Sequence, residues 1–369
     1  MTFYSFFSIG ILFFYASFML YFLSGLARLK KRPAENKSGS PYVSVVVAAR
    51  NEEDNIRDLL EDLNHQTYTN DKLQIIIADD RSTDNTWSII KNYIDKNTGF
   101  IGVKISEQSK TMTPKKNALT KAIEKSRGEI IISTDADCRV PTTWVESIVN
   151  TFDEETGIVV GYSKVDTNSE QFFDHYQAVD YLALMSANAG ALGRGNSWTG
   201  SGQNIAYRRS AFDKIDGFNP VAKQISGDDF YLVQTISKIA VAKYNINSDG
   251  FVKTKPSHNV REFINQRIRW ASNTKKLFNS DLLFLLFLFI NLFTNIILLS
   301  TLLFKDYWQF SPMFFGIKFL FDTIILFYGS NLLKTEIKIN AYLIWFFLQP
   351  IYTPLLGIFS MIGKFRWKK

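Results

Sequence analysis

The chain has 369 residues, of which 46% are hydrophobic and 15% are aromatic, and it carries a formal net charge of +7. This length accommodates one soluble domain of roughly 200 to 250 residues together with membrane segments. The single cysteine, Cys138, excludes an internal disulfide and fits a reducing compartment.

No charged residue occurs between Thr2 and Leu26, a run longer than the roughly 20 residues that a helix needs to cross a bilayer. A signal peptide carries its positive charges before the apolar run, whereas here they follow it, at Arg28, Lys30, Lys31 and Arg32. We therefore expect a transmembrane helix over residues 1–27 and a basic linker over residues 28–40. The charge asymmetry predicts an external N-terminus and a cytoplasmic middle domain.

Short β-branched runs alternate with amphipathic stretches between Pro41 and about Ile246, which is typical of a mostly parallel sheet covered by helices on both faces. The pattern predicts an α/β, Rossmann-like domain over residues 41–255. Strands are expected at 43–49, 74–78, 101–105 and 129–133, and helices at 83–94, at about 114–125 and from Asn51 onward. No strand is followed by G-x-G-x-x-G or by G-x-x-x-x-G-K-[ST], which argues against a dinucleotide oxidoreductase and a P-loop enzyme.

Ligands bind such sheets at the carboxyl ends of the strands, and acidic residues follow the apolar runs there. Asp135 and Asp137 come directly after the fourth predicted strand and would share a face if that strand continues. Two such carboxylates can hold a divalent cation that bridges phosphate oxygens, and a solvated loop is the alternative. Asp80 ends the second strand and could accept hydrogen bonds from a base or ribose hydroxyl. Helix capping is the alternative for Ser82 or Thr83 and for Asp84.

A third acidic motif, Gly227-Asp228-Asp229, precedes an apolar stretch. One of its carboxylates could be a general base that deprotonates a sugar hydroxyl. The start of a capped helix is the alternative, and it accounts for one aspartate more easily than for both.

The motif Gln266-Arg267-Ile268-Arg269-Trp270 lies near the end of an amphipathic stretch, within an expected interfacial region over residues 256–281. A helix end with Trp270 at the headgroup level is its simplest interpretation in isolation. Residues 171–185 also place apolar side chains at helical spacing. We expect this helix and 257–270 at the cytoplasmic membrane surface, with packing against the sheet as the alternative for the first.

Three further apolar runs, at 282–304, 313–330 and 339–363, predict C-terminal membrane segments over residues 282–363. Lys318 and Asp322 are four residues apart, so we expect them to pair on a helix face directed into a bundle. Pro350 and Pro354 suggest that the last segment is kinked or re-entrant. A basic tail follows at 364–369. Basic residues beside the membrane segments favour anionic lipid over nucleic acid as the partner.

Taken together, D-D-x-S-x-D, D-x-D, Asp-Asp and Q-x-x-R-W between terminal membrane segments resemble the membrane-bound family 2 glycosyltransferases. That family includes cellulose, chitin, hyaluronan and poly-N-acetylglucosamine synthases and many single-sugar transferases. The resemblance covers nearly the whole chain. It implies a GT-A fold with transmembrane helices at both ends, a nucleotide-sugar donor and Mg²⁺ or Mn²⁺ as cofactor.

The resemblance also implies roles for individual residues. The nucleotide-sugar pocket would contain Ala49, Arg50, Glu52, Asp80, Lys115 and Asp135. The metal would be held by Asp135 and Asp137, and the catalytic pair would be Asp229, as the base, with Asp228. The donor and acceptor would be enclosed by Gly202, Gln203, Asn204, Gln266, Arg269 and Trp270. Two positions depart from the family pattern, because Ala49 stands where proline or a small hydroxylated residue is common and Asp228 replaces a glutamate.

These features predict an inverting hexosyltransferase that moves a sugar, most simply from a UDP-sugar, to a lipid-linked or membrane-emerging glycan acceptor. A processive polysaccharide synthase is one alternative. A nucleotidyltransferase and a non-catalytic membrane protein on the same scaffold are alternatives of another class. The expected location is a membrane, most simply a bacterial inner membrane, crossed several times with the catalytic domain in the cytoplasm.

Overall fold

The computed structural model describes residues 3–31, 40–273 and 281–362. Its contacts divide the chain into two compact units. The sheet unit comprises Lys31–Val165 and Thr199–Lys255, and the helical unit comprises Met1–Lys30, Asp166–Trp198 and Pro256–Lys369. The expected catalytic range 41–255 thus contributes to both units, because residues 166–198 pack with the terminal helices. The predicted basic tail at 364–369 and linker residues 32–39 lie outside the described residues.

A seven-stranded sheet in the order β3-β2-β1-β4-β7-β5-β8 forms the centre of the sheet unit. Its strands are β1 (Val43–Ala49), β2 (Leu73–Asp80), β3 (Phe100–Ile105), β4 (Ile130–Asp135), β5 (Thr156–Gly161), β7 (Ile205–Arg208) and β8 (Val241–Asn245). All neighbouring pairs are parallel except those of β7, which runs antiparallel to β4 and β5. Strands β6 (Ser163–Val165) and β9 (Val252–Thr254) form a small parallel sheet. The predicted mostly parallel sheet is confirmed.

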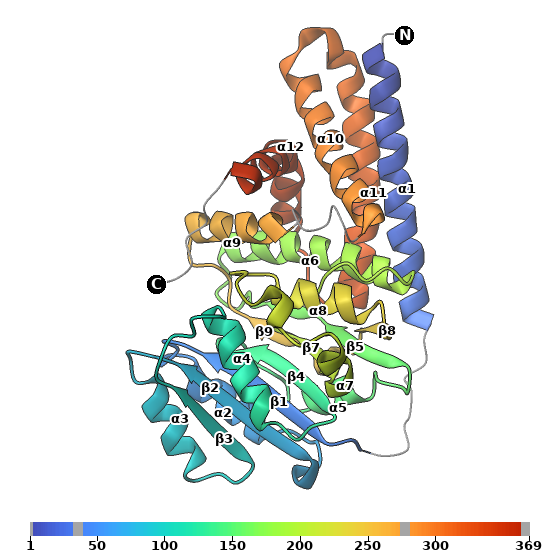
Figure 1. Cartoon of the computed structure of the whole chain (residues 1–369). Helices are drawn as coiled ribbons and strands as arrows, with labels where there is room; N and C mark the ends of the chain where they lie inside the picture. Colours follow the sequence, from blue (N-terminus) through green and yellow to red (C-terminus); the bar gives the residue numbers. More distant parts are fainter. Residues whose placement is uncertain (1–2, 32–39, 274–280, 363–369) are drawn as a thin grey trace. The chain divides into compact units, whose positions relative to one another are not determined.

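Five short helices and one longer one accompany this sheet. They are α2 (Ile56–Asn64), α3 (Thr86–Ile94), α4 (Pro114–Lys125), α5 (Trp144–Val149), α7 (Arg209–Lys214) and α8 (Asp228–Ile236). Alternate residues of β1, such as Val43, Val45 and Val47, join α2 and α5 in one buried apolar cluster. Helix α4 packs on β1 and β2 and lies across the sheet in Figure 1. Because strands are apolar on both faces, they are covered on both, as the continuous runs predict.

The segment after β1 differs from the prediction. A helix start at Asn51 is wrong, because α2 begins five residues later. Asn51 has a left-handed backbone (φ 53°), and its side-chain oxygen accepts the Thr83 N–H at 2.8 Å. The Glu53 N–H donates to Asp84 at 3.2 Å, and Asp84 also accepts the Thr86 N–H at the start of α3. These bonds join the loops after β1 and β2, and Asp84 receives the first N–H of α3 although Asn85 is the N-cap residue of that helix.

The helical unit contains four helices that are long and apolar enough to cross a membrane among the described residues. They include α1 (Phe3–Lys31), α10 (Leu282–Leu303), α11 (Ser311–Leu332) and α12 (Ile339–Ile362). Helices α1, α10 and α11 run side by side in Figure 1, and their buried aromatic and aliphatic side chains form one cluster. Large apolar residues such as Phe13 and Leu302 remain exposed, as expected for a surface that faces lipid.

Helix α6 (Phe172–Gly193) belongs to this helical unit and packs against α11 and α12. Its close approach to α1 depends on small residues, because a Cβ atom on Gly25 would overlap the Gly190 carbonyl. A Cβ atom on Gly329 of α11 would likewise overlap Ser186 of α6. Glycine at such crossings lets helix backbones approach closely, as in membrane bundles. The partners of α6 within its unit are thus membrane-type helices.

The pair predicted in the third apolar run is confirmed, because Lys318 forms an ion pair with Asp322 and both are buried within the helical unit. The Tyr15 hydroxyl of α1 donates a hydrogen bond to the same carboxylate. The last apolar run forms a continuous helix, α12, with Pro350 and Pro354 inside it. A buried charge pair inside an apolar bundle is costly unless hydrogen-bonded, and here three side chains satisfy one another.

Candidate functional site

The carboxyl ends of β2, β1 and β4 align at one edge of the sheet, and Arg50, Asp80, Asp135 and Asp137 lie at or just beyond these ends. Parallel pairing places Ala49 opposite Asp79 and Ala48 opposite Asp135. Arg50 follows β1 directly, Asp80 is the last residue of β2, and Asp137 lies two residues after the end of β4. The sheet topology therefore brings together the residues that follow β1, β2 and β4, although they are far apart in the sequence.

Asp80 is buried (4% exposed) and forms two hydrogen bonds with Arg81, at 2.9 Å from Nε and 3.2 Å from Nη2. Arg50 Nη1 from the neighbouring loop lies 3.8 Å from the same carboxylate. Asp79 is also buried, which raises the pKa of its carboxyl, although a hydrogen bond from Ser82 opposes the shift. Asp80 is thus held between two guanidinium groups, whereas Asp79 faces the protein interior.

Glu52 is fixed by backbone and side-chain contacts in the loop after β1. Its N–H donates to the Thr86 hydroxyl at 2.8 Å, and its carboxylate accepts the Asn55 side-chain amide at 2.6 Å. Ala49 is buried at the end of β1. Contacts within the protein therefore hold this loop, and a loop held in this way loses less entropy when it binds a ligand.

The D-x-D pair does not continue the strand. Strand β4 ends at Asp135, and a turn closed by the Cys138 N–H and the Asp135 carbonyl (3.2 Å) carries Asp137. The condition under which Asp135 and Asp137 would share a strand face is therefore not met, although both residues are half-buried at the end of β4. Among the described residues no three His, Cys, Asp or Glu side chains gather as a metal site, so other ligands would have to complete one.

A second cluster forms around Lys115, at the first turn of α4. Lys115 Nζ lies 2.6 Å from Asp135 Oδ1. Loss of solvent around this amine by itself lowers its pKa, but the carboxylates of Asp135, Asp228 and Asp229 outweigh that effect and raise the pKa well above its usual value. Gly202 is part of the same cluster, because a Cβ atom added there would lie 3.5 Å from Lys115 Nζ.

Asp228 and Asp229 occupy the first turn of α8, after Gly227 in a left-handed conformation (φ 86°). Asp229 accepts hydrogen bonds from the Gly202 N–H at 3.1 Å and the Phe230 N–H at 2.8 Å. Burial first, and then the neighbouring charge of Asp228, raise the pKa of Asp229 to about 6. A carboxyl group tuned to this range can accept a proton near neutral pH.

Gln203 and Asn204 hold the approach to β7. Gln203 donates to the Thr254 hydroxyl at 2.7 Å. Asn204 is fully buried: its amide donates to the Tyr162 and Gly250 carbonyls, each at 2.8 Å, and accepts the Trp144 indole N–H at 3.0 Å. These contacts use the Asn204 side chain within the fold, and the Asn204 N–H closes the turn around Gly202 by donating to the Ser201 carbonyl at 3.0 Å.

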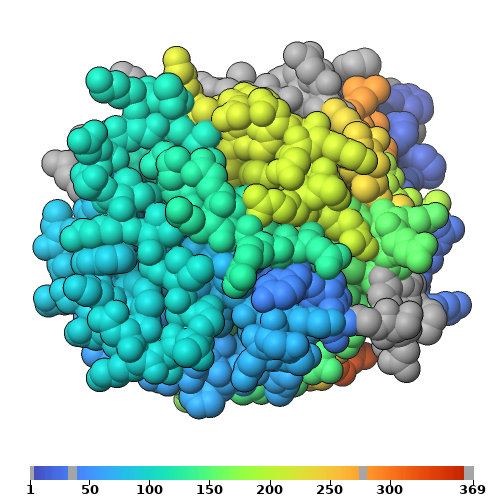
Figure 2. Space-filling view, turned by 60° about the horizontal axis from the view of Figure 1, so that its bottom comes forward, coloured from blue at the N-terminus to red at the C-terminus, as the bar shows by residue number. Residues whose placement is uncertain are grey.

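Lys116, the neighbour of Lys115, has a structural contact that the sequence does not reveal. Its side chain is 1% exposed, and Nζ donates to the Gln224 carbonyl at 2.5 Å. The Thr113 N–H donates to the Ala222 carbonyl at 2.8 Å. The start of α4 therefore holds the loop that leads into Asp228, and Figure 2 shows these two segments meeting on one face.

The helix α9 (Val260–Ser272) carries Gln266, Arg269 and Trp270 and belongs to the helical unit. All three are partly exposed, whereas Arg267 between them is 8% exposed. Arg267 Nη1 donates to the Gln266 side-chain oxygen at 2.6 Å, and the guanidinium carbon lies 4.3 Å from the centre of the Trp270 ring. The burial of Arg267 could not be predicted from the sequence, because an arginine in an amphipathic helix is normally exposed to solvent.

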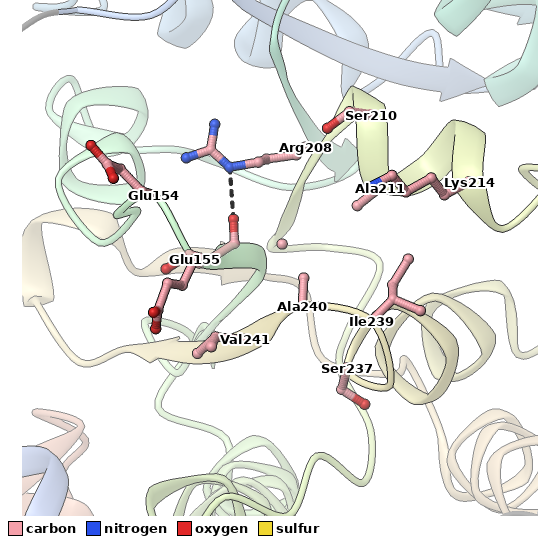
Figure 3. A pocket seen from close by; sticks show the side chains of 12 residues that line it. Glu154, Glu155, Arg208, Ser210, Ala211, Lys214, Ser237, Ile239, Ala240 and Val241 are labelled. Atoms are coloured by element: carbon pink, nitrogen blue, oxygen red, sulfur yellow. Dashed lines mark hydrogen bonds between the residues drawn. The ribbon is translucent and has the colours of Figure 1, made fainter.

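A larger hollow, of about 490 Å³, opens elsewhere in the sheet unit (Figure 3). It lies where β5 and β8 begin, and its lining includes Glu155, Arg208 and Lys214. Arg208 Nε donates to the Thr156 carbonyl at 2.8 Å. The hollow around Lys115 and Asp229 measures only about 10 Å³. None of the residues singled out from the sequence lines the larger hollow. The candidate catalytic residues therefore lie at the smaller of these two hollows.

Residues 44–216 match the family described as Glycosyl transferase family 2. The chain therefore carries a family 2 glycosyltransferase domain. Over 196 residues it is 29% identical to "Probable glycosyltransferase YdaM" of Bacillus subtilis, covering 51% of this chain and 45% of that protein. Over 197 residues it is 30% identical to a beta-monoglucosyldiacylglycerol synthase of Nostoc sp., covering 52% and 41%. The chain thus matches less than half the length of these relatives.

A third relative and one solved structure extend the comparison. A poly-beta-1,6-N-acetyl-D-glucosamine synthase of Staphylococcus aureus is 28% identical over 188 residues, covering 50% of this chain and 43% of that protein. The mannosyltransferase PcManGT of Pyrobaculum calidifontis has a similar fold, with a TM-score of 0.57 at 17% identity, covering 96% of this chain and 97% of that one. The expected GT-A architecture with membrane-type helices at both ends is confirmed.

Proposed function

We propose that this chain is an inverting glycosyltransferase that moves a sugar from a nucleotide-sugar donor to an acceptor at a membrane. The observation that supports this most directly is the cluster around Lys115. A carboxyl group with its pKa raised to about 6, Asp229, shares this cluster with a cation that pairs with Asp135 of the D-x-D motif. The side chains proposed as the proton acceptor and as partners of the charged leaving group thus belong to one cluster.

In the proposed reaction the acceptor hydroxyl attacks the anomeric carbon, and its proton passes to Asp229. The bond between that carbon and the diphosphate breaks, and the nucleoside diphosphate leaves with the electron pair. Attack from the face opposite the leaving group inverts the configuration. General base catalysis of this kind contributes ~10²- to 10⁴-fold to the rate. Gly202 and Phe230 hold the Asp229 carboxylate in place through their backbone N–H groups.

The leaving diphosphate needs its developing charge neutralised, and Lys115 is placed to do so. A bound Mg²⁺ or Mn²⁺ would add a second positive charge there. Asp135 and Asp137 would hold it, with diphosphate oxygens and water as the remaining ligands. The residues fit this group, because both carboxylates are partly exposed at the end of β4. The fold neighbour PcManGT is described in complex with GDP-Man and Mn²⁺, which is consistent with this assignment.

The nucleoside end of the donor would occupy the loops after β1 and β2. Asp80 presents a buried carboxylate there, flanked by Arg50, and Glu52 is held nearby in sequence by Thr86 and Asn55. A carboxylate can accept hydrogen bonds from a base or a ribose hydroxyl. We assign the nucleoside contact to Asp80 and Arg50, with Ala49 and Glu52 lining the pocket, and expect a UDP-sugar as the donor.

The acceptor in this proposal is a lipid-linked species or a glycan that emerges at the bilayer. Helices α6 and α9 belong to the same unit as four helices that can cross a membrane. Two relatives are named for a glycosylated diacylglycerol and for a polysaccharide. We propose a lipid acceptor ahead of a polymer channel. Gln266, Arg269 and Trp270 would close over donor and acceptor, with the domain on the cytoplasmic side.

The test is to incubate the full-length protein, in detergent and in liposomes, with a panel of nucleotide sugars and Mn²⁺. Release of a nucleoside diphosphate that depends on an added lipid acceptor supports the proposal. Consumption of a sugar 1-phosphate and a nucleoside triphosphate, with release of pyrophosphate, would instead identify a nucleotidyltransferase. Full activity on a soluble acceptor, with no gain from lipid, would contradict the membrane acceptor. The full chain is used because α6 packs against α11 and α12.

A further inference from the structure

The helical unit contains a continuous series of polar contacts that reaches the motif helix α9. Arg267 Nε lies 2.6 Å from Asp180 Oδ2 of α6, and both side chains are about one-tenth exposed. The second oxygen of Asp180 accepts the indole N–H of Trp345 in α12 at 3.0 Å. Three helices that are distant in sequence thus meet at a single carboxylate.

The same series continues into the membrane-type bundle. Lys318 Nζ lies 5.8 Å from the centre of the Trp345 ring, within the range of a cation–π contact. Lys318 pairs with Asp322, which also accepts the Tyr15 hydroxyl. Trp345 therefore contacts the buried ion pair through its ring and Asp180 through its N–H. Side chains from α1, α11, α12, α6 and α9 are joined in this order.

At the other end, the contact between Arg267 and Gln266 fixes how the motif glutamine is oriented. A guanidinium group has five N–H donors and no acceptor. Gln266 must therefore present its oxygen to Arg267, as the 2.6 Å contact shows, and its NH₂ group is directed elsewhere as a donor. The guanidinium also stacks against Phe263 at 4.5 Å and Trp270 at 4.3 Å from the ring centres. A lysine could not make these contacts together.

We propose that Asp180 and Trp345 are positioning residues for the sugar-transfer reaction. They hold Arg267, which in turn orients Gln266 as a hydrogen-bond donor toward the substrates and fixes the Trp270 ring. This inference rests on the proposed function for the role of Gln266. The burial of the Asp180–Arg267 ion pair supports this proposal. A buried ion pair adds little net stability compared with apolar residues of similar size, because both charges lose their water. What the pair does contribute is a fixed geometry between the two side chains.

The test compares Asp180→Asn, Trp345→Phe and Arg267→Lys in full-length protein with matched controls. Asp174→Asn removes another buried carboxylate of α6, Trp308→Phe another indole donor, and Arg261→Lys another arginine of α9. The three test variants should lose about 10- to 100-fold in kcat, because small misplacements of a substrate-contacting group cost this much. Donor KM should change less than threefold, and the controls should keep their kcat. Asp180→Glu should recover part of the loss.

A double-mutant cycle separates positioning from simple stability. If Asp180 acts through Gln266, the Asp180→Asn/Gln266→Ala protein should be no slower than Gln266→Ala alone. Losses in kcat that multiply would overturn the proposal, as would variants that lower the unfolding midpoint but keep kcat per folded molecule. If the wild-type protein transfers no sugar, the proposed function is what fails. The Asp180–Arg267 cycle, read then from unfolding midpoints, must still show non-additive effects, and additive ones would refute the contact itself.

Discussion

Lys115 Nζ lies 2.6 Å from Asp135 Oδ1, so the lysine that follows Pro114 in α4 is joined directly to the first carboxylate of the D-x-D motif. The charge of Lys115 also acts on Asp229, whose pKa it lowers against the larger, opposite effects of burial and Asp228. One ammonium group therefore contacts the expected diphosphate site and tunes the expected base.

Replacing Lys115 by Gln should have two separate consequences. Turnover should fall about 10²-fold or more, because the leaving diphosphate loses a positive charge. The pKa of Asp229 should also rise, so the acidic limb of the kcat pH profile should move to higher pH. Steady-state assays from pH 5 to 9 measure both effects. Lys121→Gln, on the exposed face of the same helix, is the control. A rate loss with an unmoved limb would mean that Lys115 does not act on Asp229.

The proposed role of Asp229 as the base predicts a pH dependence of activity. Since its pKa is about 6 and only the ionised form accepts a proton, kcat should rise with pH through about 6 and level off above 7. Asp229→Asn should bind the donor normally and lose ~10²-fold or more in kcat, with no such limb remaining. Asp228→Asn is the matched control. If it is inactive while Asp229→Asn is active, the base has been assigned to the wrong carboxylate.

The raised pKa of Asp229 also predicts that a neutral residue at this position makes the folded protein more stable above pH 6. A carboxyl group whose pKa is higher in the folded than in the unfolded state favours folding below its unfolded value, near 3.8, and loses this contribution as pH rises through about 6. Asp229→Asn should therefore unfold at a higher temperature than wild type at pH 7 to 8, by up to ~3 kcal/mol in free energy. The difference should vanish near pH 4. A destabilised Asp229→Asn protein at pH 8 would contradict the burial of an ionised carboxylate.

Asp137→Ala tests the metal site. It should abolish turnover and make nucleotide binding independent of Mn²⁺, because the cation loses one of two charged ligands. Isothermal titration with UDP, with and without Mn²⁺ and after treatment with a chelator, measures this dependence. Asp71→Ala, an exposed acid of the same unit, should behave as wild type. Near wild-type turnover of Asp137→Ala would remove this residue from the metal site.

Lys116→Met tests the contact that holds the loop before Asp228. Its removal deletes a hydrogen bond from a charged donor, worth about 1.5–3 kcal/mol, while the Gln224 carbonyl keeps the Thr113 hydroxyl as a donor at 3.3 Å. We expect a lower unfolding midpoint and a kcat reduced by about tenfold, with donor KM nearly unchanged, because the loop positions the base and not the nucleotide. Lys125→Met, exposed on the same helix, is the control. An unchanged unfolding midpoint of Lys116→Met would show that the loop before Asp228 keeps its conformation without the Lys116 contact.

Much of the sheet could be predicted from the sequence because burial on both faces leaves a readable mark. The run from Val43 to Ala49 is apolar except for Ser44, and β1 has these bounds. Periodicity reports that a face is buried but not what covers it, so the sequence left both the membrane surface and the sheet open as partners of residues 171–185, and the structure groups α6 with the terminal helices. The start of α2 was misplaced because Asn51 bonds to Thr83, 32 residues away in the chain. Local signals such as acidic residues 52–54 do not record such contacts.

The same limit applies to the candidate sites. Asp80, Asp135 and Asp229 could be selected because carboxylates directly after apolar runs are unusual and chemically informative. Arg267 and Lys116 could not, because a basic residue on an amphipathic helix is normally exposed. Their partners, Asp180 and Gln224, lie 87 and 108 residues away in the chain. Buried charges depend on distant partners, so they emerge only when the fold brings those partners together.

The buried pair in α11 leads to the last prediction, which separates stability from positioning. Lys318→Met leaves the Asp322 carboxylate in the bundle without its cation, which should cost about 3–5 kcal/mol of stability. Replacing all three partners, as Tyr15→Phe/Lys318→Met/Asp322→Leu, should restore most of the unfolding midpoint, since an apolar set needs no desolvation of charge.

Thermal unfolding of the full chain in detergent, followed by tryptophan fluorescence, measures both proteins, with Lys305→Met as an exposed lysine control. A triple variant as unstable as Lys318→Met alone would show that the ion pair itself stabilises the bundle. A second outcome is a triple variant that is stable but has a lower kcat than wild type. That result would mean that Trp345 needs the charge of Lys318 to keep Asp180 and Arg267 in their positions. If the kcat of the triple variant is also restored, positioning of α9 begins at Trp345, and the pair serves only to join α1 to α11.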